Sequence, residues 1–271
     1  MKIKSQMKLN LKLFKKLAQN LCFLYNNLMK RILLKIAYNG SKFHGWQRQE
    51  GQRTVQGEIE NAIFVAFKQH CDVFASGRTD AGVHALAQQA HFDIEDSVPV
   101  NKIKTILNRV LPLDITILSA KKMKNDFHAR FNVTSKTYMY KLYTGERNCF
   151  ICDKVAFVTT PFDIDKMKYI SKLFVGEHNF KGFCSSQTSS ENFVRTIYNI
   201  EFIQKKNILN IEITGNGFLM NMVRILVGSM LDYAQGKITE EKLKNALEKG
   251  DRSQSGRTMP PQGLYLKKVY Y

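Results

Sequence analysis

The chain has 271 residues, 44% of them hydrophobic and 24% charged, which is the composition of a soluble globular protein with a sizeable core. Lysine and arginine total 41 against 23 aspartates and glutamates, so the formal net charge is +18. This composition argues against a membrane protein and favours a polyanionic partner such as nucleic acid, with a lysine-rich proteome as the plainer alternative.

Residues 1–28 form a distinct basic stretch at the start of the chain. Leucines recur there at helical spacing among lysines, with no acidic residue, which predicts a basic amphipathic helix. The longest apolar run, LCFLY, is too short for a membrane span and poor as the core of a signal peptide. We interpret residues 1–28 as a peripheral extension, with organellar targeting as the alternative.

Residues 29–134 have the pattern of an α+β half. Apolar and polar residues alternate over 31–38, as in a half-buried strand, and apolar residues recur at helical spacing over 54–69. In chain order we expect a strand at 31–38, a helix at 54–69, strands at 72–77 and 85–94, a helix at 100–110 and a strand at 114–123. This is the order of a β-α-β-β-α-β unit.

Residues 135–271 read as a second, similar half. Its expected elements are a strand within 127–144, a helix at 163–174, strands at 193–204 and 208–215, helices at 219–235 and 239–249, and a final strand at 263–271. We predict an α+β fold in which two ferredoxin-like or RRM-like halves join their antiparallel sheets around a central cleft, with flanking helices. Binding chemistry is expected in that cleft.

The segment SGRTDAGVHA, residues 76–85, sets two charges among small residues. In an extended chain Arg78 and Asp80 project to the same face, where Arg78 can keep the carboxylate ionised even when water is excluded. Gly77 and Gly82 permit a sharp bend and the close approach of a ligand. The plainer alternative is a structural ion pair that closes a turn.

A second charge stands in an otherwise apolar helix. Arg224 shares one helical stripe with Asn221, Gly228 and Asp232. A charge in such a helix is costly unless it is paired, so we expect the stripe to face the cleft, with Arg224 contacting Asp80 or a phosphate. A bridge between Arg224 and Asp232, or between the two halves, is the alternative.

Several motifs together resemble the tRNA pseudouridine synthases of the TruA family. The first is GRTDAGVHA, whose aspartate matches the nucleophile of that family. The others follow in the expected order between residues 30 and 271: YNGSKFHGWQRQ, TVQGEIENAI, DFHARFNVTSKTYMY, VRTIYNI, NGFLMNMVRILVG and PPQGLYLKKVYY. The resemblance therefore extends over nearly the whole chain.

The resemblance implies an enzyme that isomerises uridine to pseudouridine in the anticodon stem-loop of tRNA, typically at positions 38, 39 and 40. Asp80 is then the nucleophile, attacking C1′ of the ribose or adding to C6 of the base, with Arg78 and Arg224 as further catalytic candidates. Tyr138 corresponds to the tyrosine that stacks on the base, and Leu264 to a residue lining the uracil pocket. The family also implies a homodimer and a reaction without a cofactor.

Four other side chains are candidates for RNA contacts. His128 and Arg130, in FHARF, either brace the cleft or touch the RNA, and Arg48 and Arg195 are candidates for phosphate contacts. Solvated surface charges are the plainer interpretation of the two arginines.

The cysteines indicate no metal site. Five scattered cysteines suggest reduced thiols and a cytoplasmic protein. Cys149 and Cys152 form a CxxC pair, but no second ligand pair lies at zinc-binding spacing. We expect neither a metal nor a cofactor.

Two other classes of function compete with an isomerase. A non-catalytic RNA-binding protein with two RRM-like halves would carry the aromatic RNP motif, and no segment fits that motif. A nucleotide-binding or glycosidic hydrolase would need a Gly-Lys-Ser/Thr phosphate loop or a local pair of acids, which the sequence also lacks. The isomerase is therefore the favoured interpretation.

Overall fold

The computed structural model describes residues 29–186 and 191–271. The predicted amphipathic extension, residues 1–28, lies outside the described residues. Within the two described ranges, no helix has both the length and the apolar character that a membrane crossing requires.

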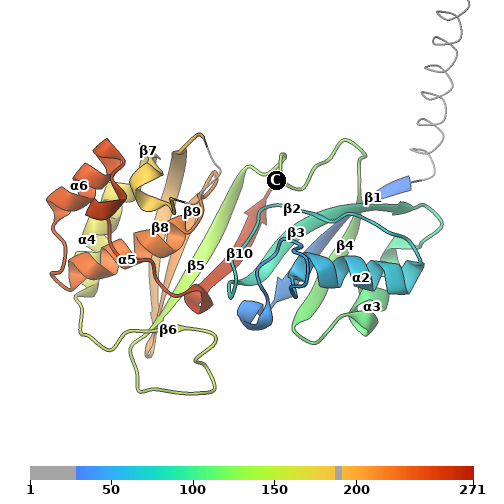
Figure 1. The fold of residues 1–271 in the computed structure, drawn as a ribbon, viewed down its shortest axis with the longest axis horizontal. Helices are drawn as coiled ribbons and strands as arrows, with labels where there is room; N and C mark the ends of the chain where they lie inside the picture. Colours follow the sequence, from blue (N-terminus) through green and yellow to red (C-terminus); the bar gives the residue numbers. More distant parts are fainter. Residues whose placement is uncertain (1–28, 187–190) are drawn as a thin grey trace, which may run out of the picture.

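The first half has the predicted β-α-β-β-α-β order (Figure 1). Its elements are β1 (Met29–Tyr38), α2 (Val55–Phe67), β2 (Phe74–Ala75), β3 (His84–Glu95), α3 (Val100–Val110) and β4 (Ile115–Met123). The strands lie in the order β4–β1–β3, and β2 pairs with the outer edge of β3, as in a ferredoxin-like unit. The apolar residues of β1 alternate as predicted, and Ile32, Leu34 and Ile36 are fully buried.

The second half repeats this arrangement with additions. Its elements are β5 (Ser135–Tyr143), β6 (Ala156–Phe157), α4 (Ile164–Ser171), β7 (Gly176–Asn179), β8 (Val194–Lys205), β9 (Ile208–Gly215), α5 (Met222–Ala234), α6 (Glu240–Lys249) and β10 (Leu264–Tyr270). The strands lie in the order β10–β5–β9–β8, the same as in the first half, and β7 extends the edge. The short strands β6 and β7 were not predicted.

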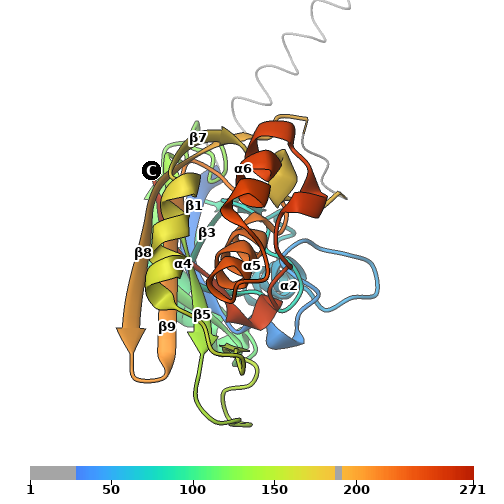
Figure 2. The same ribbon diagram turned by 90° about the vertical axis from the view of Figure 1, so that its left-hand side faces the viewer.

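The two halves share one sheet, and this joint positions the site. Strand β10 pairs antiparallel with β5 and parallel with the start of β3, where Tyr265 lies beside His84 and Leu266 beside Ala85. The helices lie on one face of this continuous sheet (Figure 2). The pairing brings the segment just before β3, which carries Asp80, next to the second half.

Some predicted boundaries differ from the structure, and two of these differences fall on segments that line the cleft. Strand 72–77 shrinks to Phe74–Ala75, and the helix predicted from residue 219 begins at Met222. Asn221, just before that helix, has a left-handed backbone with φ of 60°, which a continuing helix does not allow. Residues 216–221 therefore form a loop rather than a helical turn.

Candidate active site

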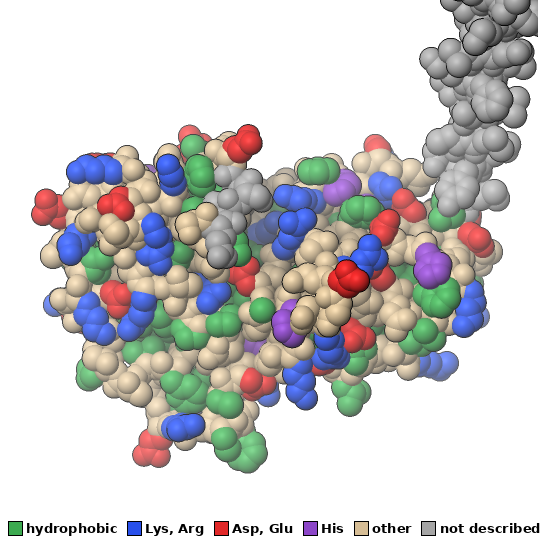
Figure 3. Space-filling view, in the orientation of Figure 1, with side chains coloured by type: hydrophobic (Ala, Val, Ile, Leu, Met, Phe, Trp, Pro, Cys, Tyr) green, Lys and Arg blue, Asp and Glu red, His purple; other side chains and the backbone are tan. Residues whose placement is uncertain are grey.

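A cleft of about 1070 Å³ lies between the two halves, beside the strands that join them. Its walls are the segment 73–80 from the first half, residues 216–223 from the second half, and side chains of β5 and the β4–β5 connection. Basic side chains gather at the hollow between the halves (Figure 3). The predicted central cleft is thus present, and it is lined by positive charge.

The loop that carries Asp80 is held by the segment after β1. Trp46 donates its backbone N–H to the carbonyl of Thr79 at 3.0 Å, and Gly82 donates to Phe43 at 3.3 Å. Gly82 has φ of +77°, a conformation that favours glycine, so the chain turns sharply just after Asp80. The loop is therefore fixed on both sides of the carboxylate by backbone contacts.

Asp80 faces the cleft, and among the described residues its cationic partner is Arg224. Its Oδ2 lies 3.7 Å from Nη1 of Arg224, and its side chain is one-third exposed. Burial raises the pKa of Asp80 above the usual value of 3.8, although the charge of Arg224 and a hydrogen bond from it act in the opposite direction. The carboxylate is consequently poorly solvated, which favours its use as a nucleophile.

Arg224 is itself held firmly in place. Its Nε donates to the carbonyl of Met259 at 2.6 Å, and its Nη1 donates to Oδ1 of Asn221 at 2.7 Å. Burial lowers the pKa of Arg224, and the charge of Asp80 acts against that effect. The predicted contact between Arg224 and Asp80 is confirmed. Asp232 accepts a hydrogen bond from the backbone of Arg257 and pairs with its side chain, so the alternative Arg224–Asp232 bridge is absent among the described residues.

The predicted pairing of Arg78 with Asp80 is wrong. Within the described part of the chain Arg78 forms no ion pair, and Arg224 is the cation that affects the pKa of Asp80. Arg78 nevertheless lines the same cleft, so its side chain is available to a ligand. Spacing along a strand puts two residues on one face but does not make them partners, and a residue from the other half supplies the cation instead.

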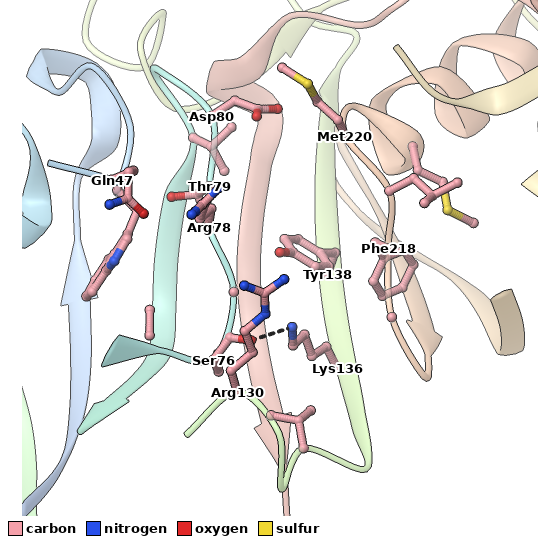
Figure 4. Close-up of a pocket in the computed structure, with 18 of the residues that line it drawn as sticks. Gln47, Ser76, Arg78, Thr79, Asp80, Arg130, Lys136, Tyr138, Phe218 and Met220 are labelled. Carbon is pink, nitrogen blue, oxygen red and sulfur yellow. Dashed lines mark hydrogen bonds between the residues drawn. The ribbon is translucent and has the colours of Figure 1, made fainter. Parts of the chain in front are cut away.

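Tyr138 forms the aromatic wall of the cleft. It lies on β5, is buried, and meets the ring of Phe218 edge to face with centroids 5.1 Å apart. Burial raises the pKa of Tyr138 strongly, so its hydroxyl keeps its proton at any physiological pH. Leu264, at the start of β10, also lines the cleft. A flat base could lie between these groups and Asp80 (Figure 4).

Three of the four predicted RNA-contacting residues line the cleft. These are His128, Arg130 and Arg195. Arg48 lies outside it and pairs with Glu60 at 2.9 Å. The ring of His128 stacks on Phe131, with centroids 4.3 Å apart. Burial lowers the pKa of His128, so this imidazole is neutral near pH 7.

Sequence reasoning assigned no role to several other residues of the cleft, among them Lys136, Phe131, Phe218 and Met220. Alternation along β5 places Lys136 on the same face as Tyr138, and this pattern could have marked it. Met220 was missed because residues 219–235 were interpreted as a helix, and Phe218 lies just before that range. Phe131 is 77% exposed, and nothing in the local pattern separates it from an ordinary loop residue.

Metal-binding groups are not found in this region. Among the described residues no cluster of three or more His, Cys, Asp or Glu side chains could hold a metal ion. Cys149 and Cys152 are exposed free thiols.

Comparison with known proteins finds a matching family and relatives that share one description, tRNA pseudouridine synthase. Residues 35–132 and 170–271 match the family described as tRNA pseudouridine synthase. The chain is 42% identical over 244 residues to tRNA pseudouridine synthase A of Anoxybacillus flavithermus, covering 90% of this chain and 99% of that protein. It is 43% identical over 246 residues to the protein of the same name from a Geobacillus strain, again covering 90% and 99%. A chain in a solved Cbf5–Nop10–Gar1 complex is similar with a TM-score of 0.35 and 11% identity, covering 87% of this chain and 58% of that one.

Proposed function

Because the chain belongs to the tRNA pseudouridine synthase family, we propose that it isomerises uridines 38, 39 and 40 in the anticodon stem-loop of tRNA, with Asp80 as the nucleophile. One observation carries this assignment. Among the described residues that line the cleft, Asp80 is the only carboxylate; it pairs with the partly buried Arg224 and shares the cleft with the ring of Tyr138.

The reaction conserves every atom and transfers no electrons to or from the enzyme. The N1–C1′ bond of uridine breaks, the uracil turns, a C5–C1′ bond forms, C5 loses its proton, and N1 gains one. Asp80 forms a transient bond, at C1′ of the ribose or at C6 of the base, and is released at the end. No cofactor is required for this sequence.

The residues around Asp80 support these steps. Arg224 keeps the carboxylate ionised in a partly dry cleft, so it is ready to attack. Tyr138 offers its ring as a stacking surface for the everted base. Because its pKa is raised, Tyr138 acts with its proton in place and is a poor base.

A non-catalytic RNA-binding protein is less well supported. A partly buried carboxylate within a basic cleft repels the phosphates of RNA and has a raised pKa, so it weakens binding and stability alike. Such a group is understandable when it takes part in a reaction.

Mapping of pseudouridines tests the proposal. Unmodified tRNA is incubated with the wild-type protein and with Asp80→Ala, and modified positions are then located. We expect modification in the anticodon stem-loop with the wild-type protein and none with the variant. Equal modification by both proteins would contradict the role of Asp80.

We further propose that the enzyme acts in the cytoplasm as a homodimer. A tRNA bound across two chains would let one cleft reach several neighbouring uridines. Sedimentation of the full chain with and without tRNA tests the dimer, and a single chain in the active complex would contradict it.

A further inference from the structure

Three basic side chains meet at one end of the cleft. Arg130 comes from the β4–β5 connection, Lys136 from β5 and Arg195 from β8. The guanidinium of Arg130 lies beside the ammonium of Lys136, on the side of the Tyr138 ring away from Asp80 (Figure 4). These three residues are called the basic cluster below.

The chain supplies the basic cluster with no carboxylate. None of the ion pairs among the described residues includes one of its members. The two stretches outside the description, residues 1–28 and 187–190, contain no aspartate or glutamate in their sequence. Lys136 donates to the carbonyl of Ser76 at 2.7 Å, and Arg195 donates to the backbone carbonyl of Val194 at 2.6 Å. Neutral backbone carbonyls, rather than carboxylates, thus accept from Lys136 and Arg195.

This arrangement is unfavourable in the free protein. Burial and, to a lesser extent, the charges of Arg130 and Arg195 together lower the pKa of Lys136 to about 8. Burial also lowers the pKa of Arg195. Like charges in a partly dry site repel one another and attract an anion strongly.

We propose that the basic cluster binds one phosphodiester group of the RNA, the one belonging to the nucleotide whose base lies against Tyr138. The choice of RNA as the source of this phosphate rests on the proposed function. Lys136 and Tyr138 are two residues apart on β5, a separation of about 7 Å. That span is comparable to the span between the base and the phosphate of one nucleotide.

The three side chains suit a phosphate group. The guanidinium groups of Arg130 and Arg195 can each bind two oxygens, and the ammonium of Lys136 adds a point charge from strand β5. A phosphate fixed there would set the position of the sugar and leave the base to turn towards Asp80. The basic cluster is therefore a positioning site for the reacting nucleotide.

Neutralising single phosphates in an anticodon stem-loop RNA tests this site. Each loop linkage is replaced in turn by an uncharged methylphosphonate, and binding is measured with wild-type protein and with Lys136→Gln. At one linkage beside the target uridine, we expect about tenfold or greater loss with the wild type and less than about twofold loss with the variant. Glutamine keeps a side-chain N–H for the Ser76 carbonyl, so the comparison isolates the charge. Equal losses for both proteins at every linkage would overturn the proposal.

A matched control lies on the same strand. Lys141 belongs to β5 but does not line the cleft, and its ammonium lies 4.2 Å from the centre of the Tyr265 ring. Lys141→Gln should keep the wild-type pattern of losses. If Lys136→Gln does not fold, as thermal unfolding will show, Arg130→Gln carries the same test because that side chain is exposed.

The pH dependence of RNA binding provides a second test of the phosphate site. The groups that face Lys136 are Arg130, Arg195 and the Ser76 carbonyl, with Asp80 on the far side of Tyr138. Because the protonated amine binds the phosphate, wild-type affinity should fall as pH rises from 7 to 9, and Lys141→Gln should follow it. Lys136→Gln should show a smaller fall, and an identical fall would contradict the proposal.

Pseudouridine formation is measured in the same samples to separate the two claims. If the wild type forms pseudouridine but no linkage depends on Lys136, the phosphate site is wrong and the proposed function stands. If the wild type forms no pseudouridine while one linkage depends on Lys136, the proposed function is wrong and the phosphate site stands.

Discussion

The two ends of the cleft differ in how their charged side chains are paired. At one end the carboxylate of Asp80 lies 3.7 Å from Arg224, so the two charges balance. At the other end Arg130, Lys136 and Arg195 share no carboxylate. The first end holds the carboxylate of Asp80 ready for reaction. The second end, the basic cluster, has no carboxylate partner, so a phosphate of the substrate has to supply the negative charge. Changes at the first end should therefore alter the rate, and changes at the second should alter binding.

The largest effect is expected for Asp80→Asn. Loss of the nucleophile should reduce isomerisation by at least ~10³-fold, because the remaining residues cannot form the covalent bond. Affinity for tRNA should stay within a few-fold of the wild type, since binding rests on the basic surface. Single-turnover assays and a filter-binding titration measure the two quantities. A large loss of affinity with the rate retained would reverse the assignment of the two ends.

Arg224→Met should give the next largest effect. Arg224 lowers the pKa of Asp80 against the effect of burial, so its removal should raise that pKa further. A smaller fraction of Asp80 is then ionised at a given pH, and the acid limb of the rate profile moves to higher pH. We expect loss of this charged neighbour, at 3.7 Å from Asp80, to cost about 1.5–3 kcal/mol, which corresponds to a roughly 10- to 100-fold slower reaction near neutral pH.

The control for this change is Arg257→Met. Arg257 pairs with Asp232, which lies on α5 like Arg224, and neither Arg257 nor Asp232 lines the cleft. Its pH profile should match that of the wild type. An acid limb that does not move in Arg224→Met would show that the contact with Asp80 is structural.

Phe131→Ala should weaken binding without a comparable change in maximal rate. The exposed ring lines the cleft and rests on His128, so it offers a stacking surface for a loop base. Stacking of one base contributes about 1–3 kcal/mol, or roughly 5- to 100-fold in affinity. Phe150, which is 83% exposed and lies outside the cleft, provides the matched variant Phe150→Ala. Equal affinities for the two variants would remove the stacking role.

The smallest effect concerns stability, and its pH dependence has opposite sign at the two ends. The pKa of Asp80 is raised above 3.8, so its ionised form costs stability above the folded-state pKa. Asp80→Asn should therefore melt a few degrees higher than the wild type at pH 7, with the gain lost as pH falls towards 3.8. The pKa of Lys136 is lowered from 10.5 to about 8, so the gain in Lys136→Gln should be full below pH 8 and fade towards 10.5. Melting curves across this pH range check both signs.

Much of the fold could be predicted because burial leaves a periodic pattern. The alternation in β1 and the helical spacing in α2 each identify an element that packs on one face. The parallel contact between β3 and β10 has no such signal, since it joins residues 181 positions apart, as Tyr265 and His84 are. The short strands β6 and β7 were likewise too brief to show a period.

The site was predictable where local chemistry was unusual. Asp80 and Arg224 stand out because each charge lies among apolar or small neighbours. The pairing of Asp80 with Arg224 rather than with Arg78 depends on how the halves meet, which spacing does not reveal. Lys136 became significant only when Arg195, distant in sequence, was found near it together with Arg130.

Tritium release from tRNA labelled at C5 of uridine, measured under single-turnover conditions with Asp80→Asn and Lys136→Gln side by side, tests the division of the cleft most directly. At saturating protein, Asp80→Asn should bind tRNA and release no tritium. Lys136→Gln should still release tritium but need a higher protein concentration to do so. Release by Asp80→Asn at the wild-type rate would contradict the central claim that this carboxylate performs the reaction.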